Sequence, residues 1–301
     1  MKLLVIYGGI GPEREVSLRS GKYVYNALLD AGYNVDILDL KSEVESIADQ
    51  LSKYDLVVPI VHGEQGEDGQ LQKLFADRKV KYLGSERAVC IKVYNKAESH
   101  KLFESNGVRM PQYQVVSKSD FDNSELSKKP FVLKPVEGGS SIDTVIAREV
   151  TDYNNNLCHK YLNRHGYMLL EELINGTEVT VPVLDNKALE VVLIQPPDGM
   201  EFDYENKYNG STKEICPIPS GLVSEDKQLE LRDLALRIHR MAGVRHLSRS
   251  DFIISDDGDI YMLEINTMPG MTDESLFPKS AKAAGMSMSE LCDQLVRLAT
   301  E

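Results

Sequence analysis

Two acidic side chains near the end of the chain are spaced so that they could bind a metal ion. Asp251 and Glu264 flank an apolar segment whose centre, Asp257-Gly258, is a strong signal for a two-residue hairpin turn. Such a turn sets Asp251 directly opposite Glu264, with Asn266 on the same face. Two carboxylates and an amide oxygen, without a His or Cys ligand, suit a hard cation, Mg²⁺ before Zn²⁺.

The same segment also has a simpler interpretation, an acidic hairpin exposed to solvent. Like charges directly opposite each other destabilise a sheet unless something positive lies between them. A pair of acids on its own therefore leaves both interpretations open. Other features of the sequence are needed to distinguish a metal site from a solvated turn.

A second segment with chemical potential follows an apolar run in the middle of the chain. Lys134-Pro135 precedes a loop rich in Gly and Ser, VEGGSS at residues 136–141. Glycines allow backbone N–H groups to approach phosphate oxygens, and Lys134 adds a positive charge. The loop is not a Walker A motif, which requires GxxxxGK[ST], and ordinary turns use the same residues. The loop is therefore a candidate phosphate site that needs support from elsewhere.

Composition excludes several classes of partner. The chain has 301 residues and a formal net charge of -13, so nucleic acid and anionic membranes, which need basic surface, are not expected as partners. An anionic ligand must be held by a local cluster of Lys, Arg and metal. The four cysteines are scattered without CxxC spacing, and no apolar stretch suits a signal peptide or a membrane span. These features predict a cytoplasmic protein with reduced thiols.

The first part of the chain alternates strands and helices, which is typical of a parallel α/β sheet. We expect three strands and one helix there, at Leu3–Tyr7, Val35–Leu38, Leu56–Val61 and about Ser17–Ala31. Ligands of such sheets bind at the carboxyl ends of the strands. Gly8-Gly9 and His62-Gly63 follow two of the expected strands, so both pairs belong to a candidate ligand-binding edge.

The remainder of the chain has a less regular rhythm. It is expected to contain further strands and helices, at about Asn95–Glu104, Tyr113–Val116, Phe131–Lys134, Leu169–Glu172, Glu178–Val183, Glu225–Gly243 and Ser287–Ala299. We therefore predict three units of α/β and α+β type. They comprise residues 1–87, 88–178 and 179–301, and the last unit carries the acidic hairpin.

Taken together, the motifs resemble those of a known family. Seven segments occur in order: GGIGPEREVSLRSG, HGEQGEDGQLQ, FVLKPVEGGSS, LLEELINGTE, FDYENKY, SRSDF and LEINTMPGMTDESLFP. Their combination resembles the D-alanine–D-alanine ligases, members of the ATP-grasp fold. The resemblance runs from about residue 7 to residue 298. The last segment together with HGEQGEDG is highly specific, whereas the Gly/Ser loop alone is widely shared.

The resemblance implies a fold and an activity. The fold is a three-domain ATP-grasp fold whose N-terminal domain has a Rossmann-like parallel sheet. The activity is ATP-dependent ligation of two D-alanines, through an acylphosphate, to the dipeptide used for peptidoglycan and the cell wall. Phosphorylation turns a carboxylate oxygen into a good leaving group, so the protein has mainly to align charges and neutralise them. The resemblance also suggests a cytoplasmic homodimer.

The resemblance assigns residues to the nucleotide and the metals. Asp251, Glu264 and Asn266 match ligands of two Mg²⁺ (or Mn²⁺) ions, in agreement with the hairpin geometry. The phosphate-binding lysines of the family match Lys96, Lys134 and Lys207; without the family each would be read as a surface charge. The adenine and ribose contacts match the Glu171 carboxylate, the backbone of Leu173 or Ile174, and Glu178.

The resemblance assigns a second group of residues to the amino acids. Glu13 matches the acceptor of the first D-alanine's ammonium, although on its own an acid near a helix N-terminus needs no ligand. Ser140 and Tyr208 match hydroxyls that close the site with Glu13. The remaining matches are His62 beside the substrate, Arg249 with the Gly270 N–H at the oxyanion, and Ser275 and Leu276 at the second substrate's carboxylate.

Three features bear on specificity, on the covering of the site and on departures from the family. Tyr208 favours an amine as second substrate, because relatives that make D-Ala-D-lactate lack a Tyr there, and Asn206–Pro217 resembles the mobile loop that covers the site. Asp143 replaces the last glycine of the usual KPxxxGSSxG loop. The alternatives are an ATP-grasp ligase with D-serine, D-lactate or another amino acid as second substrate, and a nucleotide-binding protein without catalysis.

Overall fold

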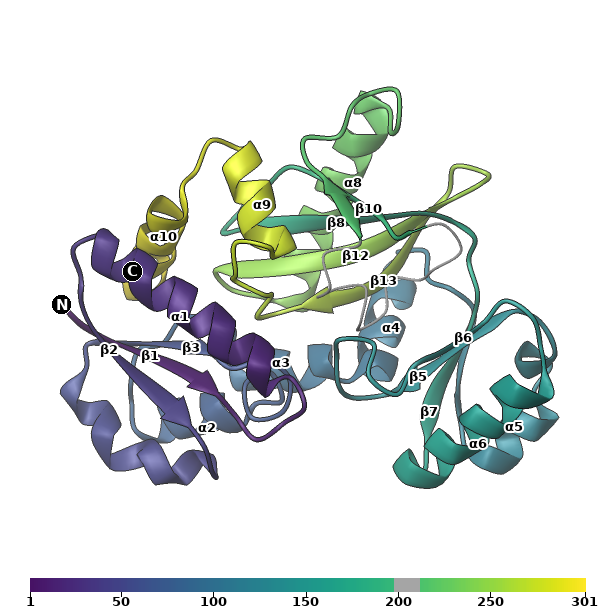
Figure 1. Ribbon diagram of the computed structural model, residues 1–301, viewed down its shortest axis with the longest axis horizontal. Coiled ribbons are helices and arrows are strands. Elements are labelled where there is room, and N and C mark those ends of the chain that lie inside the picture. The colour runs from purple at the N-terminus through teal and green to yellow at the C-terminus, as the bar shows by residue number, and fades with distance from the viewer. Residues whose placement is uncertain (198–211) are drawn as a thin grey trace.

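The computed structural model describes residues 1–197 and 212–301. Within these ranges the strands form three sheets, and most of the helices lie beside them (Figure 1). The first sheet is parallel and the other two are antiparallel. The predicted combination of a parallel N-terminal sheet with later α+β units is confirmed. None of the described helices is long and apolar enough to cross a membrane.

The N-terminal sheet has the strand order β2-β1-β3. Its elements are β1 (Lys2–Gly8), α1 (Arg14–Asp30), β2 (Asn34–Leu40), the 3-10 helix η1 (Val44–Lys53), β3 (Leu56–Ile60) and α2 (Gln70–Asp77). Continuous apolar runs favour strands covered on both faces, and Leu3, Val5 and Leu56 are fully buried. Gly9 and His62 follow β1 and β3 at the same edge of the sheet, as the alternation of strands and helices predicted.

The last helix of the chain, α10 (Met288–Thr300), returns to this N-terminal sheet, and Figure 1 shows it beside α1. The helix before it, α9 (Leu276–Ala283), packs mainly against the third sheet, which is described below. Leu291 and Leu295 of α10 share one buried cluster with Val24 and Leu28 of α1. The amphipathic pattern of residues 287–299 predicted the helix, but it did not predict which sheet the helix covers.

The second sheet has the order β4-β7-β5-β6. Its strands and the helices that belong to it are β4 (Tyr113–Val116), α5 (Lys118–Asn123), η2 (Leu126–Lys128), β5 (Phe131–Pro135), β6 (Val145–Ala147), α6 (Asp152–His165) and β7 (Met168–Glu172). Phe131, Leu133 and Leu170 are fully buried between the sheet and its helices. The Gly/Ser loop connects β5 to β6 and therefore leaves the sheet at its edge.

The third sheet follows the order β11-β10-β8-β12-β13, with β9 paired to β8. Its strands are β8 (Gly176–Leu184), β9 (Lys187–Ala188), β10 (Val192–Gln195), β11 (Lys213–Ile215), β12 (Leu247–Ser255) and β13 (Ile260–Asn266). The helices that pack near it include α3 (Arg87–Tyr94), α4 (Lys96–Ser105) and α8 (Glu225–Ala242). Val181, Leu231 and Phe252 bury the apolar face of this sheet against α8.

The acidic hairpin forms with the predicted pairing but with a different turn. Asp251 lies opposite Glu264, as predicted. The predicted two-residue turn is wrong: the Ser255 N–H donates to Asp259 O at 2.8 Å, so three residues, 256–258, form the loop. Gly258 takes φ +84°, which suits the left-handed position of such a loop. A β-bulge between Asp251 and Phe252 shifts the register by one residue and restores the acidic pair.

The expected division into three units remains a proposal. Arg87, at the first boundary, is the first residue of α3. Glu178, at the second boundary, lies inside β8, which is paired with β10 and β12 of the third sheet. A cut placed before β8 would keep that sheet within one unit.

Candidate active site

Two cavities meet at Glu264. The first, about 730 Å³, lies between the second and third sheets. The second, about 470 Å³, is bordered by the loops after β1 and β3 of the N-terminal sheet and by the start of α9. Glu264 lines both cavities, and Asp251 lines the first while Asn266 lines the second. The acidic hairpin therefore forms the junction between two adjoining binding spaces.

A buried ionic network lies at the inner end of the first cavity. Glu171 of β7 is only 2% exposed, and its Oε2 is 2.8 Å from Lys134 Nζ of β5. Its Oε1 accepts a 2.5 Å bond from His100 Nε2 of α4. Burial works to raise the pKa of Glu171, but Lys134 and His100 outweigh it, so the pKa is lowered. The carboxylate is therefore held ionised beside a lysine.

Lys96 connects α4 to the Gly/Ser loop. Asn95 caps the helix by accepting a bond from Glu98 N, which fixes Lys96 as its first residue. The Lys96 Nζ donates to Gly138 O, and its N–H donates to Val136 O at 2.8 Å. Burial lowers the pKa of Lys96. A cation is thus placed under the loop that borders the first cavity.

The other residues expected at the nucleotide also line the first cavity. They are Leu173, Ile174 and Glu178. The Leu173 N–H donates to Pro130 O at 3.1 Å, so that hydrogen is already used within the protein. Glu178, the third residue of β8, borders the cavity from the third sheet, and Glu171 borders it from the second sheet. The expected acceptors thus border the cavity from both sheets.

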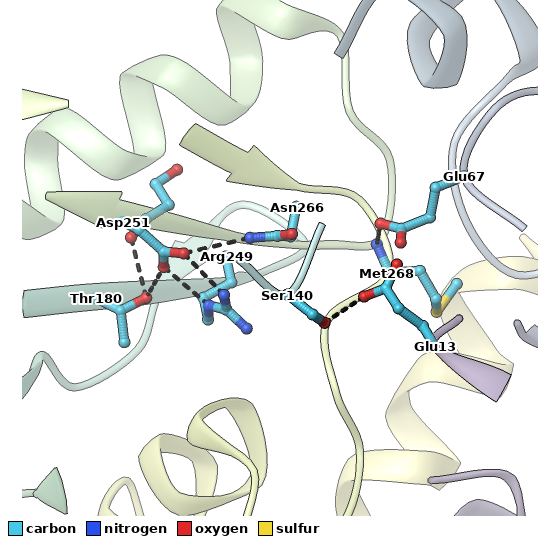
Figure 2. Close-up of polar contacts among 9 residues, drawn as sticks. Glu13, Glu67, Ser140, Thr180, Arg249, Asp251, Asn266 and Met268 are labelled. Atoms are coloured by element: carbon cyan, nitrogen blue, oxygen red, sulfur yellow. Dashed lines mark hydrogen bonds and ion pairs between the residues drawn. The ribbon is translucent and has the colours of Figure 1, made fainter. Parts of the chain in front are cut away.

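Asp251 is surrounded by donors (Figure 2). Arg249, two residues earlier on the same face of β12, donates from Nε to Oδ1 at 2.9 Å and from a terminal nitrogen to Oδ2 at 2.8 Å. Thr180 Oγ1 donates to Oδ1 at 2.5 Å, and Asn266 Nδ2 reaches Oδ2 at 3.4 Å. Asp251 is 7% exposed, so Arg249 supplies the positive charge that a buried carboxylate needs.

The described residues contain no group of three or more His, Cys, Asp or Glu side chains placed to hold a metal ion. The candidate ligand set is instead two carboxylates, Asp251 and Glu264, and the amide of Asn266. These are oxygen donors of the kind that Mg²⁺ prefers. The set fits a hard cation chemically, on condition that Arg249 releases the carboxylate of Asp251.

Glu13 connects the N-terminal unit to the Gly/Ser loop. It precedes α1, is 8% exposed, and accepts a hydrogen bond from Ser140 Oγ. Two glycines leave room for it: a Cβ on Gly63 would lie 2.2 Å from Glu13 Oε2, and one on Gly139 would lie 3.1 Å from Oε1. The carboxylate therefore sits in a close-fitting cradle on the wall of the second cavity, as Figure 2 shows for its contact with Ser140.

His62 lines the second cavity but has partners within the protein. Its Nδ1 donates to Met268 O at 3.0 Å, and its Nε2 accepts from Ser20 Oγ at 3.1 Å. Burial lowers the pKa of His62, which is consistent with a neutral ring. The ring joins the loop after β3 to the segment after β13, so it shapes the wall of the cavity.

The far end of the second cavity is formed by the start of α9. Ser275 precedes this helix and Leu276 is its first residue. Ser275 Oγ is 3.0 Å from Thr272 N and 2.8 Å from Thr272 Oγ1, and a Cβ on Gly270 would lie 2.8 Å from it. The positive end of the helix dipole here would favour a carboxylate.

Lys207 and Tyr208, which the sequence placed at the phosphates and at the first substrate, lie outside the described residues. The expected covering loop at residues 206–217 is described only from residue 212 onward. There, Lys213–Ile215 forms β11 and pairs with β10.

Comparison with known proteins identifies the family. The family described as D-ala D-ala ligase C-terminus matches residues 102–297. A D-alanine–D-alanine ligase of Francisella philomiragia is 35% identical, covering 99% of this chain and 98% of the relative. One of Methylacidiphilum infernorum is 36% identical, covering 98% and 94%. The chain belongs to the D-alanine–D-alanine ligase family.

Solved structures agree with this membership. The D-alanine–D-alanine ligase of Bacillus anthracis complexed with ATP has a TM-score of 0.84 at 25% identity, covering 99% of this chain and 97% of that one. The VanG D-Ala:D-Ser ligase of Enterococcus faecalis has a TM-score of 0.80 at 26% identity, covering 99% of both chains. The predicted ATP-grasp fold is confirmed.

Glu67 also lines the second cavity of this member of the D-alanine–D-alanine ligase family. It was not predicted as a site residue from the sequence. It accepts a hydrogen bond from Gly63 N at 2.7 Å and one from Met268 N at 3.3 Å, the second of which Figure 2 shows. Glu67 therefore connects the loop after β3 to the segment after β13. Burial, reinforced by Glu13, raises the pKa of Glu67 to about 8. The motif HGEQGEDG was a signal for this residue, but it contains three acids and does not show which one faces the cavity.

Glu67 should make stability depend on pH. An acid whose pKa is raised by folding binds its proton more tightly in the folded state. Its contribution to the free energy of unfolding is therefore complete below the ordinary pKa of 4.5 and is lost as the pH rises through about 8. We expect Glu67→Gln to remove this loss, so that the variant's midpoint of thermal unfolding falls less between pH 6 and pH 9. Glu64→Gln, at an exposed neighbour, is the control. Equal slopes for Glu67→Gln and the unaltered protein would contradict the assignment.

Proposed function

We propose that this chain joins two D-alanine molecules to D-alanyl-D-alanine with cleavage of ATP to ADP and phosphate. Membership of the ligase family supports the reaction, and the observation that carries it to this chain is the meeting of two cavities at Glu264. A phosphoryl donor in the first cavity would there face an amino acid carboxylate in the second. Reacting groups held in this way need little further ordering to react.

The first cavity is proposed to hold ATP. Glu171 would accept from the adenine amino group while Lys134 donates to an acceptor beside it or to a phosphate. Because the Leu173 N–H is already used by Pro130, we assign the backbone donor to Ile174. Glu178 would accept from the ribose hydroxyls. Phosphate contacts are assigned to Lys96, Lys207 and the N–H groups of the Gly/Ser loop.

Asp251, Glu264 and Asn266 are proposed to hold divalent cations, two Mg²⁺ or Mn²⁺ ions. Bound there, the cations would neutralise phosphate oxygens and so favour phosphoryl transfer. The oxygen donors support this assignment, and so does the position of Glu264 between the cavities. In the absence of cations Arg249 neutralises Asp251, and this pairing would have to loosen before Asp251 could serve as a ligand.

The second cavity is proposed to orient the two amino acids. Glu13, held by Ser140, would accept from the ammonium of the first D-alanine, with Tyr208 and His62 closing that side. The carboxylate oxygen of the first D-alanine attacks the γ-phosphorus, and ADP leaves. The second D-alanine, its carboxylate at Ser275, Leu276 and the α9 N-terminus, then attacks the acylphosphate carbonyl. Phosphate leaves, the amine loses a proton, and Arg249 with the Gly270 N–H stabilises the oxyanion.

The proposal extends to the setting of the reaction. The dipeptide would serve peptidoglycan precursor synthesis, with small-molecule partners only, in the cytoplasm. The described cysteines are all free and three of them are buried, which supports a reducing compartment. A homodimer is proposed on the family resemblance alone.

A second amino acid other than D-alanine is the main alternative, because the structural relatives include a D-Ala:D-Ser ligase. Phosphate release should be measured with ATP and D-alanine alone, and then with D-serine or D-lactate added. We expect turnover with D-alanine alone and little increase with either addition, with the dipeptide identified by mass. ATP binding without turnover under any of these conditions would instead indicate a non-catalytic nucleotide-binding protein.

A further inference from the structure

The Gly/Ser loop has an unusual backbone. Ser140, Ser141 and Asp143 take φ values of +53°, +56° and +54°, a region that side chains other than glycine seldom adopt. Each such residue costs on the order of 1 kcal/mol and persists only where its surroundings hold it. Ser140 is held by Glu13. The chain therefore needs a second fixed point at the other end of the loop.

Asp143 provides that point. Its two carboxylate oxygens lie 2.9 and 2.7 Å from Arg164 Nη1, and Oδ2 lies 2.8 Å from His165 Nε2. Arg164 and His165 are the last two residues of α6, where cations also suit the helix dipole. Burial works to raise the pKa of Asp143, but His165 and Arg164 outweigh it and the pKa is lowered. The carboxylate is thus ionised and paired.

The side chain of Asp143 lies away from the first cavity. Its neighbours Ile142 and Thr144 line that cavity, whereas Asp143 does not. The family loop usually has glycine at this place, and an added negative charge close to a triphosphate would weaken its binding. The pairing with α6 removes both difficulties, because it turns the charge outward and neutralises it.

We propose that Asp143 is a positioning residue, which fixes the Gly/Ser loop in its nucleotide-binding conformation through Arg164 and His165 of α6. It touches no substrate. It acts through the backbone N–H groups and the hydroxyls of residues 139–142, which are already arranged before ATP arrives, so less ordering is needed on binding. The proposal rests on the proposed use of ATP in the first cavity.

Four variants test this role in the full chain. Asp143→Gly removes the anchor and also relieves the backbone strain, while Arg164→Ala leaves the carboxylate with only His165. We expect each to raise KM for ATP about fivefold with kcat changed less than twofold, as contacting residues typically couple on this scale. The double variant, Asp143→Gly with Arg164→Ala, should have a KM for ATP no higher than that of Asp143→Gly alone. Without the Asp143 carboxylate, Arg164 has nothing to neutralise. His159→Ala is the control, since His159 is on the same helix but pairs with Asp122 of α5.

A purely structural role predicts a different pattern. If the substitutions merely destabilised α6, His159→Ala would raise KM for ATP as much as Arg164→Ala does. The effects of Asp143→Gly and Arg164→Ala on KM would then add in the double variant. Either of these results, or an unchanged KM in Asp143→Gly, would overturn the proposal. Calorimetric titration of ADP into each variant without amino acid separates this question from the reaction. Wild-type protein that binds ADP but does not ligate D-alanine contradicts the proposed function and leaves the anchor measurable.

Discussion

The Glu264→Ala variant is expected to lose on the order of 10³-fold in kcat, a loss that practically abolishes ligation. Glu264 is the side chain shared by the two cavities, so its removal affects both the proposed cation site and the approach of the reacting groups. The loss should appear in steady-state phosphate release at saturating ATP and D-alanine.

The fold should survive this substitution. Glu264 is half-buried and faces the cavities, while its neighbours Leu263 and Ile265 keep their places in β13. The midpoint of thermal unfolding should therefore stay close to that of the unaltered protein. Asp256→Ala, at the exposed tip of the same hairpin, controls for an effect of removing any acid from this ribbon. Ligation by Glu264→Ala at the rate of this control would show that the metal assignment is wrong.

The Arg249→Ala variant is expected to lose both activity and stability. Removal of one group that stabilises developing negative charge typically costs about 10²–10³-fold in kcat. Separately, the variant leaves Asp251, which is 7% exposed, without its two-point ion pair. Breaking a buried pair from one side costs about 3 kcal/mol of unfolding free energy, because a charge remains without compensation. Urea denaturation measures the second effect and steady-state kinetics the first.

A second substitution distinguishes the two effects. Asp251→Asn in the Arg249→Ala background removes the uncompensated charge, so we expect most of the lost stability to return while kcat stays low. Arg249→Lys keeps a positive charge but not the two parallel bonds, and it should fall between the parent and Arg249→Ala. An Arg249→Ala protein as stable as the parent would mean that Asp251 does not depend on this pairing.

The sequence correctly predicted that Asp251 pairs with Glu264, but the two-residue turn on which this prediction rested was wrong. Alternation along β12 and β13 places Asp251 and Glu264 on one face, and this held. The turn was longer by one residue, and a bulge after Asp251 compensated. A bulge is set by packing across the whole sheet rather than by the turn residues, so the local pattern could not reveal it.

Several elements that the sequence did not predict carry weak local patterns. Strands β6, β9, β10 and β11 have only two to four residues each, too few to show alternation. Helix α6 buries only Cys158 and Leu162, so its apolar stripe is faint. In both cases the local sequence pattern is too weak to predict the element.

The polar contacts of the site were the least accessible to sequence reasoning. The bonds of Glu171 to His100 and of Asp251 to Thr180 join residues about 70 positions apart. The family resemblance predicted roles for residues within the motifs. It could not show that Arg249 neutralises Asp251 or that α6 holds Asp143. Those pairings depend on how the sheets and helices meet in space.

The return of α10 to α1 also governs the order in which the chain can mature on the ribosome. The first sheet to be synthesised cannot complete its core until Leu291 and Leu295, near the other terminus, have emerged. A nascent chain stalled before residue 276 would leave the apolar side chains of α1 uncovered and open to chaperones. The N-terminal sheet can therefore complete its core only after the second and third sheets have been synthesised.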